Sequence, residues 1–463
     1  MFKKAYFSAL ALLAAILFLP STAWTQAEIL YQNELGLPDR AAFSPEVAVS
    51  SGGEVYVVFL DRPDPTAPPP KRKHGEHSHR SSVDLWIARS DDGGSSFQSP
   101  SMVNHEHGVI WGFQVSKPRV SIDDHGTVHI FYPGNAQSSQ TRLDVIASQY
   151  TRSLDKGATF SEPVMLNSHV KKDGRGLLGE ELGAAHAFGT MGVAPDGTVH
   201  TFWLDTRYMG NPSQGATLFT ASSKDGGATF GTEIEFARDV VCPCCQLVAD
   251  FVGDEAVLVS YRHVFDDGSR DSVVLRSTDD GQTWPELARL PIDPWYIGGC
   301  PLKPTDMAVN ENYVYSVSFS AGPEQQGVWF SRSRNGALAF EEAMHLHPAS
   351  KYSDAPVITV TPSGVVRVVW HSREGRKSPY RLYMSESYDH GETFTAPWEL
   401  PTPESGDSRF PVMATDADGN SHVAWEQQVR IGEIVTTEVH VMGIAAPSTG
   451  PTRVIASLGQ GAE

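Results

Sequence analysis

Cysteine is scarce in this chain of 463 residues, which contains only four. Three of them, Cys242, Cys244 and Cys245, lie within the hexapeptide VCPCCQ, and Cys300 follows in the stretch GGCPLKP. Four cysteines allow at most two disulfides, and sequence alone cannot choose among their three complete pairings. The clustering raises the question of which face of the fold these residues occupy.

Basic residues are also few, with 36 Lys and Arg against 55 Asp and Glu. Lys3 and Lys4 are the only charges in the first 27 residues, so removal of that segment takes the net charge from −19 to −21 (34 basic against 55 acidic residues). A surface this acidic disfavours nucleic acid and anionic membranes. We expect a partner of neither kind.

Long apolar runs are absent except near the start, where residues 5–20 follow the two lysines. Thr25 and Ala27 suit the −3 and −1 positions of a signal-peptidase site, so residues 1–27 are predicted to be a secretory signal. A membrane anchor is the alternative, but the run is short for a bilayer and ends at Pro20. We expect a secreted or periplasmic protein without membrane insertion, and a monomer.

No composition shift divides residues 28–463, which we interpret as one domain built from repeats. One motif, S-x-D-x-G-x-x-[FW], recurs at 90–97, 153–160, 223–230, 277–284 and 387–394, and a degenerate copy, SRNGALAF, occupies 333–340. The aspartate can accept backbone N–H bonds in a tight turn, and the glycine supplies a conformation that a side chain would oppose. These acids are therefore structural rather than catalytic.

A second pattern precedes the motifs, an alternating strand, a polar turn and another strand. It occurs at 47–59, 120–132, 193–203, 248–261, 307–319, 357–370 and 412–425. Alternation around a Gly, Asp or Asn turn predicts a hairpin, and each unit adds two further strands. The sequence therefore predicts an all-β protein, a β-propeller of four-stranded antiparallel blades. Seven blades are expected, with six as the alternative.

The five full motifs resemble the Asp-box (BNR) repeats of the sialidase, or neuraminidase, superfamily. This resemblance covers residues 40 to 455 and implies that the motifs join third and fourth strands, on the side away from the active site. The loops between blades and the loops after second strands then build the opposite face. VCPCC and GGCP enter adjacent blades there, which predicts one sulfur cluster at the channel mouth.

Three states of this cluster remain open. Oxidising surroundings favour disulfides, with Cys300 bridging to one member of the triplet. Thiolates with a nearby imidazole or thioether suit copper(I) or zinc, and His186 and Met191 enter the adjacent blade. A redox-active thiol is the third state. No cofactor other than these two metals is expected.

Sialidases grip a substrate carboxylate with three arginines and attack with a tyrosine that a glutamate assists, while an aspartate donates a proton. The resemblance implies Arg262 as one arginine, Asp61 as the acid, Tyr352 as the nucleophile and Glu181, or its neighbour Glu180, as the assistant. Further ligand-binding candidates on the same face are Arg119, Arg207 and Arg409. Phe43 stands where the first arginine of the family belongs, so the catalytic set is incomplete.

Two classes of function follow. The first is a propeller whose upper face binds a glycan, another small ligand or a metal without turnover, with Trp111 available to stack on a sugar. The alternative is an exo-α-sialidase-type glycoside hydrolase, and a copper- or zinc-binding protein is the second alternative. Whether the protein is an enzyme stays open at this point.

Overall fold

The computed structural model describes residues 27–38, 40–62, 83–135, 146–168, 186–209, 215–299, 301–322 and 325–447. Every regular element in these ranges is a β-strand, and every strand pairing is antiparallel, as the alternating pattern predicted. Within the same ranges, no helix is long and apolar enough to cross a membrane. The protein is therefore all-β in the part that is described.

The strands form five four-stranded sheets and one eight-stranded sheet. Four of the four-stranded sheets follow the chain in order: β2 (Ala41–Val49), β3 (Val55–Arg62), β4 (Asp84–Ser90) and β5 (Ser101–Met102); β6 (Arg119–Ile122), β7 (Val128–Asn135), β8 (Ile146–Ser153) and β9 (Val164–Met165); β18 (Thr305–Asn310), β19 (Tyr313–Ser320), β20 (Gly327–Ser333) and β21 (Met344–His345); β22 (Asp354–Val360), β23 (Val366–Ser372), β24 (Arg381–Ser387) and β25 (Trp398–Glu399).

The eight-stranded sheet contains β10 (His186–Val193), β11 (Val199–Asp205), β12 (Ala216–Ser223), β13 (Ile234–Val241), β14 (Val248–Val252), β15 (Ala256–Val264), β16 (Arg270–Ser277) and β17 (Glu286–Arg289). A single residue pair, Val241 with His263, joins its two halves, β10–β13 and β14–β17. All seven predicted hairpins are present as antiparallel pairs of strands.

The fifth four-stranded sheet joins the two ends of the described chain. Its order is β26 (Asp407–Thr415), β27 (Ser421–Ile431), β28 (Ile434–Ile444) and β1 (Ile29–Leu35). Ile29 pairs with Ile444 and Leu35 with Val439, so the first strand of the chain is the outermost strand of the last sheet. This explains why the last hairpin has no aspartate motif, since no turn connects its third strand to its fourth.

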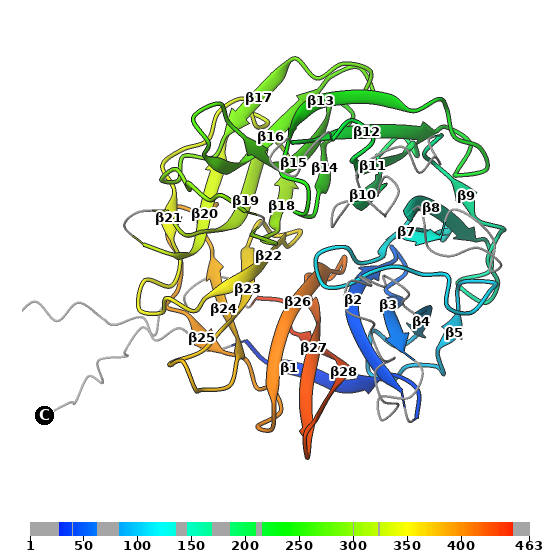
Figure 1. Cartoon of the computed structure of the whole chain (residues 1–463). Coiled ribbons are helices and arrows are strands. Elements are labelled where there is room, and N and C mark those ends of the chain that lie inside the picture. Colours follow the sequence, from blue (N-terminus) through cyan, green and yellow to red (C-terminus); the bar gives the residue numbers. More distant parts are fainter. Residues whose placement is uncertain are drawn as a thin grey trace, which may run out of the picture.

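The sheets are arranged in a ring (Figure 1), and the cavity at its centre marks what we call the channel. Seven strands, β2, β6, β10, β14, β18, β22 and β26, contribute residues to the cavity at its centre. The second strands are covered on both faces, so that β11, with the sequence VHTFWLD, is buried at every position. Because neighbouring sheets cover both faces of such a strand, apolar residues such as Phe202 and Trp203 are buried on opposite sides.

The repeated motif forms the same turn at each full copy, between the third and fourth strands of a sheet. In the first copy, Gly94 donates its backbone N–H to Ser90 Oγ at 2.8 Å, and Ser96 donates its N–H to Asp92 Oδ1 at 2.8 Å. The hydroxyl of Ser96 also donates to Asp92 at 2.6 Å. These hydrogen bonds lower the pKa of Asp92 to about 2. The carboxylate is therefore occupied in holding the turn.

Candidate functional site

The channel encloses a cavity of about 220 Å³ whose wall carries several charged side chains. Lys117, at 9% exposure, bonds Glu46 at 2.8 Å. Arg119 donates from Nη1 to Glu46 at 3.1 Å and from Nη2 to the carbonyl of Leu247 at 2.9 Å. Arg119 was predicted as a ligand-binding residue; it faces the channel, with its guanidinium engaged by these protein groups.

Two carboxyl groups of the channel strands were not predicted. Burial raises the pKa of Asp250 to about 7 and that of Asp306 to about 6. Asp306 Oδ2 accepts the backbone N–H of Ile358 at 2.8 Å, and Asp250 Oδ1 accepts that of Phe251 at 2.8 Å. The only sequence signal was an acid interrupting an otherwise apolar first strand.

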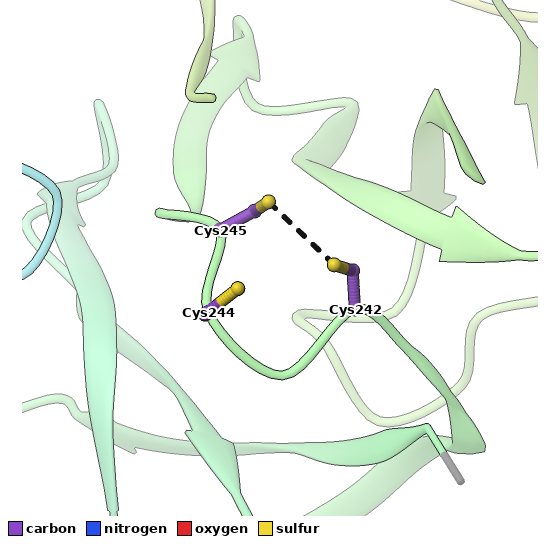
Figure 2. A group of neighbouring side chains, drawn as sticks. All are labelled: Cys242, Cys244 and Cys245. Atoms are coloured by element: carbon purple, nitrogen blue, oxygen red, sulfur yellow. Dashed lines mark hydrogen bonds between the residues drawn. The ribbon is translucent and has the colours of Figure 1, made fainter. Parts of the chain in front are cut away.

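The cysteine triplet follows β13 and is buried beside the channel. Cys242, Cys244 and Cys245 are 0%, 5% and 2% exposed, and their sulfur atoms lie within 4.8 Å of one another. Cys242 and Cys245 are free cysteines, with their Sγ atoms 3.7 Å apart and facing each other (Figure 2), whereas Cys244 is disulfide-bonded. Cys300, the expected fourth member, lies outside the described residues.

Two arginines of the neighbouring strands β15 and β16 accompany these thiols. Arg270 donates from Nη1 to Cys242 Sγ at 3.4 Å. The pKa of Cys245 is lowered to about 6 by a hydrogen bond from Cys242 and, against the effect of burial, by Arg262 and the backbone N–H of Lys303. The pKa of Cys242 is raised by its hydrogen bond with Cys245, by burial and by the charge of Cys245 beside it. The pair therefore favours a single thiolate, on Cys245.

Arg262, predicted as a catalytic arginine, is 2% exposed. It donates from Nη1 to the carbonyl of Arg270 at 2.8 Å and from Nη2 to the carbonyl of Phe319 at 3.0 Å, and it stacks on Trp295. Its guanidinium thus donates to two backbone carbonyls, and its positive charge lowers the pKa of Cys245.

Asp61, the predicted acid, is fully buried at the end of β3. Arg40 Nε lies 2.6 and 2.7 Å from its two carboxylate oxygens. Burial raises the pKa of Asp61, and Arg40 opposes that shift. Glu181 and Glu180 lie outside the described residues. The structure therefore brings an aspartate and an arginine together in this blade, inside the fold.

A comparable buried ion cluster lies at the end of β11. His186 Nδ1 and Asp205 Oδ2 are 2.6 Å apart, and Arg207 Nε donates to the same oxygen at 2.9 Å. Burial alone would raise the pKa of Asp205, yet His186 and Arg207 lower it to about 2. Arg207 also bonds Glu233 at 2.7 Å. His186 and Arg207 thus share Asp205 as a carboxylate partner. Met191, the other residue predicted beside them, lines the channel cavity.

Trp111, predicted to stack on a sugar, is 7% exposed and packs edge-on against Phe113 and Phe188. It belongs to the same apolar cluster as the three described cysteines. Its indole ring is therefore part of the core between sheets.

A second group of charged and aromatic residues lies at the ends of the strands in the last two sheets. We name Arg373, Arg409, Tyr352 and Tyr380 the arginine–tyrosine cluster. Both guanidinium carbons lie 4.6 Å from the centre of the Tyr380 ring, and that of Arg373 lies 4.7 Å from the Tyr352 ring. Arg409 and Tyr352 were predicted; Arg373 and Tyr380, which lie in the connection between β23 and β24, were missed.

Several other arginines in the described ranges bond a carboxylate or, as Arg152 and Arg262 do, a backbone carbonyl. Arg40, Arg207, Arg289, Arg332 and Arg367 each pair with a carboxylate. Within the described ranges, neither Arg373 nor Arg409 forms an ion pair, and the buried Nε of each has no hydrogen-bond partner. Buried guanidinium donors are normally satisfied, so this pair is suited to an anionic ligand.

His371 supports the cluster from below. It is fully buried and accepts the backbone N–H of Phe410 on Nδ1 at 3.1 Å. Its pKa is lowered to about 3, chiefly by burial; Asp354 opposes this shift, and the nearby Arg409, Lys303 and Arg373 add to it. The imidazole is therefore neutral at pH 7 and adds no charge to the two guanidinium groups.

No protein-family model matches the chain, and no curated protein does. Solved structures with a similar fold include an ulvan lyase of polysaccharide lyase family PL25, at 14% identity and a TM-score of 0.53, covering 89% of this chain and 95% of the lyase. A protein of unknown function from Dyadobacter fermentans has 14% identity and a TM-score of 0.50, with coverages of 90% and 99%. A Hadza microbial sialidase has 13% identity and a TM-score of 0.47, with coverages of 90% and 96%.

The likeness to the ulvan lyase identifies the fold as that of a β-propeller found in glycan-active proteins. At this identity it carries the fold alone, so the function must be argued from the residues of this chain.

Proposed function

We propose that this protein is an exported, seven-bladed β-propeller of the Asp-box type that binds an acidic glycan without a complete sialidase catalytic set. The arginine–tyrosine cluster is the proposed binding site, on the face opposite the aspartate turns. The observation that carries the proposal is the pair of guanidinium groups, Arg373 and Arg409, that have no carboxylate partner among the described residues.

The charge of the site argues for an anionic ligand. A planar guanidinium presents parallel N–H donors that match a carboxylate, and two of them beside one ring can hold one acidic group between them. The protein as a whole carries a net charge of −19. An anion therefore gains from this site only because positive charge is concentrated locally, which selects ligands that reach both arginines.

The tyrosines argue for a sugar. Tyr352 and Tyr380 are half-buried and held by the arginine side chains, so each ring is fixed before a ligand arrives. A fixed aromatic face with a polar edge suits the apolar face of a pyranose ring. The ulvan lyase of similar fold was solved with a glucuronate-containing oligosaccharide, which is consistent with an acidic polysaccharide as ligand.

Two of the predicted catalytic residues are engaged elsewhere, which favours binding over turnover. Asp61 is enclosed with Arg40, and Arg262 holds two backbone carbonyls and the cysteine pocket. An acid that donates a proton to a glycosidic oxygen must reach the substrate. Asp61 has no exposed surface from which to do so.

The test is isothermal titration of the protein with an oligoglucuronate and with sialyllactose, against neutral lactose as control ligand. We expect one acidic sugar to bind, and the affinity to weaken with added salt. Arg409→Gln and Arg373→Gln should each lower that affinity at least tenfold, because a hydrogen bond to a charged group contributes about 1.5–3 kcal/mol. Arg376→Gln, an exposed position in the same loop, should leave it unchanged.

Equal binding of lactose and the acidic sugars, or unchanged affinity in both variants, would refute the assignment. A hydrolase of exo-α-sialidase type is the second candidate, favoured by the contact of Tyr352 with Arg373. It predicts release of free sialic acid from a synthetic α-sialoside, lost in Tyr352→Phe. Absence of release by folded protein that still binds sialyllactose would remove the hydrolase and retain the binding function.

We also propose that Cys244 pairs with Cys300. Cys242 and Cys245 are free and Cys244 is bonded, and the chain has only one further cysteine. Such a bond would link the loops that enter two adjacent sheets. Peptide mapping without reduction tests it, and a Cys300 that alkylates as a free thiol would contradict it.

A further inference from the structure

The two free cysteines form a site that the proposed glycan function does not use. Cys242 and Cys245 stand three positions apart, with their Sγ atoms 3.7 Å apart and both side chains buried (Figure 2). We propose that Cys242 and Cys245 form a redox-active dithiol, which a small hydroperoxide oxidises to an intramolecular disulfide.

The surroundings of the pair activate one sulfur as a nucleophile. Arg270 donates a hydrogen bond to Cys242 Sγ, and the positive charge of Arg262 and the backbone N–H of Lys303 lower the pKa of Cys245. A thiolate, not a thiol, attacks peroxide, and nearby cations together with the Cys-x-x-Cys spacing favour that form. Cys245 receives most of this stabilisation, so it is the attacking residue and Cys242 the resolving one.

The reaction balances without a further reactant. The Cys245 thiolate attacks one peroxide oxygen, the O–O bond breaks, and Cys245 becomes a sulfenic acid while hydroxide leaves. The Cys242 sulfur then attacks Cys245 Sγ, forming the S–S bond and releasing the sulfenic oxygen as water. The net change converts two thiols and one hydrogen peroxide into one disulfide and two waters.

Burial restricts the oxidant to small molecules. The thiols are enclosed in an apolar cluster that contains Trp111, Phe188 and Leu247, so a protein partner cannot reach them. Gln246, the residue after Cys245, lines the channel cavity. A molecule the size of water can therefore reach Gln246, next to Cys245, through the channel cavity.

The same surroundings disfavour a metal at this pair. A copper or zinc ion needs lone pairs beside the thiolates, from imidazole, carboxylate or further sulfur. The groups directed at Cys242 and Cys245 are hydrogen-bond donors, and two of them are cations. Of the imidazole and thioether expected from the sequence, His186 bonds Asp205 and Met191 lines the channel cavity.

The experiment starts from the full mature chain with two free thiols, obtained by limited phosphine treatment if they are already oxidised. One equivalent of hydrogen peroxide is added at pH 7, and thiols, intact mass and unreduced peptides are followed. We expect both thiols to be lost with two hydrogen atoms, and one peptide crosslink between Cys242 and Cys245.

The variants distinguish the two sulfurs. Cys242→Ser should stop at the sulfenic acid on Cys245, seen as a gain of one oxygen in the intact mass and mapped to that residue. Cys245→Ser should consume peroxide at least tenfold more slowly, since a thiol with a pKa near 8.5 has a thiolate fraction at pH 7 about thirtyfold smaller than one near 6. Arg270→Gln should slow the reaction, and Arg276→Gln, on the same strand but paired with Glu286, should not.

Three results would overturn the proposal: both thiols persisting in excess peroxide, a crosslink that involves a different pair, or equal rates for the two serine variants. Stoichiometric copper or zinc that protects both thiols would also overturn it, in favour of a metal site. Thermal unfolding of each variant verifies that a slow reaction is not a loss of fold.

Discussion

Substitution of Gly227 by alanine tests the role of the aspartate turns in joining neighbouring sheets. Gly227 has φ +81°, and a Cβ there would overlap the Tyr150 hydroxyl of the preceding sheet. Tyr150 is itself fully buried and lies 2.6 Å from His129 Nδ1, so it cannot move aside without losing that contact. The turn therefore needs glycine for both its backbone and its neighbour.

The magnitude follows from three terms. A left-handed backbone costs a non-glycine residue about 1–2 kcal/mol, and overpacking a buried site costs about 1–3 kcal/mol. Alanine recovers about 0.4–1 kcal/mol by restricting the unfolded chain. Gly227→Ala should therefore lower the free energy of unfolding by about 1–4.5 kcal/mol.

The degenerate sixth motif supplies a matched control, because Ala337 occupies the equivalent position with φ +69°. Ala337→Gly removes the backbone penalty but loses a buried methyl group, worth about 0.8 kcal/mol, and adds freedom to the unfolded chain. Its effect should lie within about 1 kcal/mol of zero. Urea unfolding followed by tryptophan fluorescence measures both, at unchanged m-value. If Gly227→Ala shifts the midpoint no more than Ala337→Gly does, the packing argument fails.

Two further predictions concern buried groups. Asp250→Asn should stabilise the protein at pH 8 far more than at pH 4. The pKa of Asp250 in the folded protein is about 7, against about 3.9 in an unfolded chain, so the folded state holds an extra proton between these values. The wild type therefore loses stability as the pH rises from about 4 to 7. Urea midpoints across that window check the sign, and a variant whose pH dependence matches the wild type contradicts it. Trp111→Ala should cost about 3–5 kcal/mol as a core truncation without lowering glycan affinity; reduced affinity in folded protein would restore Trp111 as a ligand residue.

The strand pattern of the fold was readable from sequence because each hairpin alternates around a turn residue and each aspartate motif repeats. The pairing of Ile29 with Ile444 was not, since it joins segments from opposite ends that share no local signal. The degenerate motif at 333–340 still forms the turn, because Asn335 accepts the backbone N–H of Ala339 at 3.1 Å.

The site was harder to predict, because exposure depends on how side chains fold back. Arg262 and Asp61 stand at strand ends as the resemblance implied, yet each turns inward to a buried partner. No sequence pattern indicated that Tyr352 would contact Arg373, or that Arg409 would contact Tyr380. The members of that group lie between residues 352 and 409 and come from two sheets, so no local pattern indicates their contact.

The pairing of β1 with β28 means that the circle cannot be completed until the last strands have been made. A nascent chain must keep an exposed strand edge at its beginning, with Tyr31 and Asn33 unpaired, for as long as the rest takes to emerge. A chain that ended before residue 434 would lack β28, so that β1 and β27 would each keep an unpaired edge and the ring would stay open. We expect such truncated chains to be degraded or to associate through their unpaired strand edges. Closure of the ring therefore depends on the C-terminal hairpin.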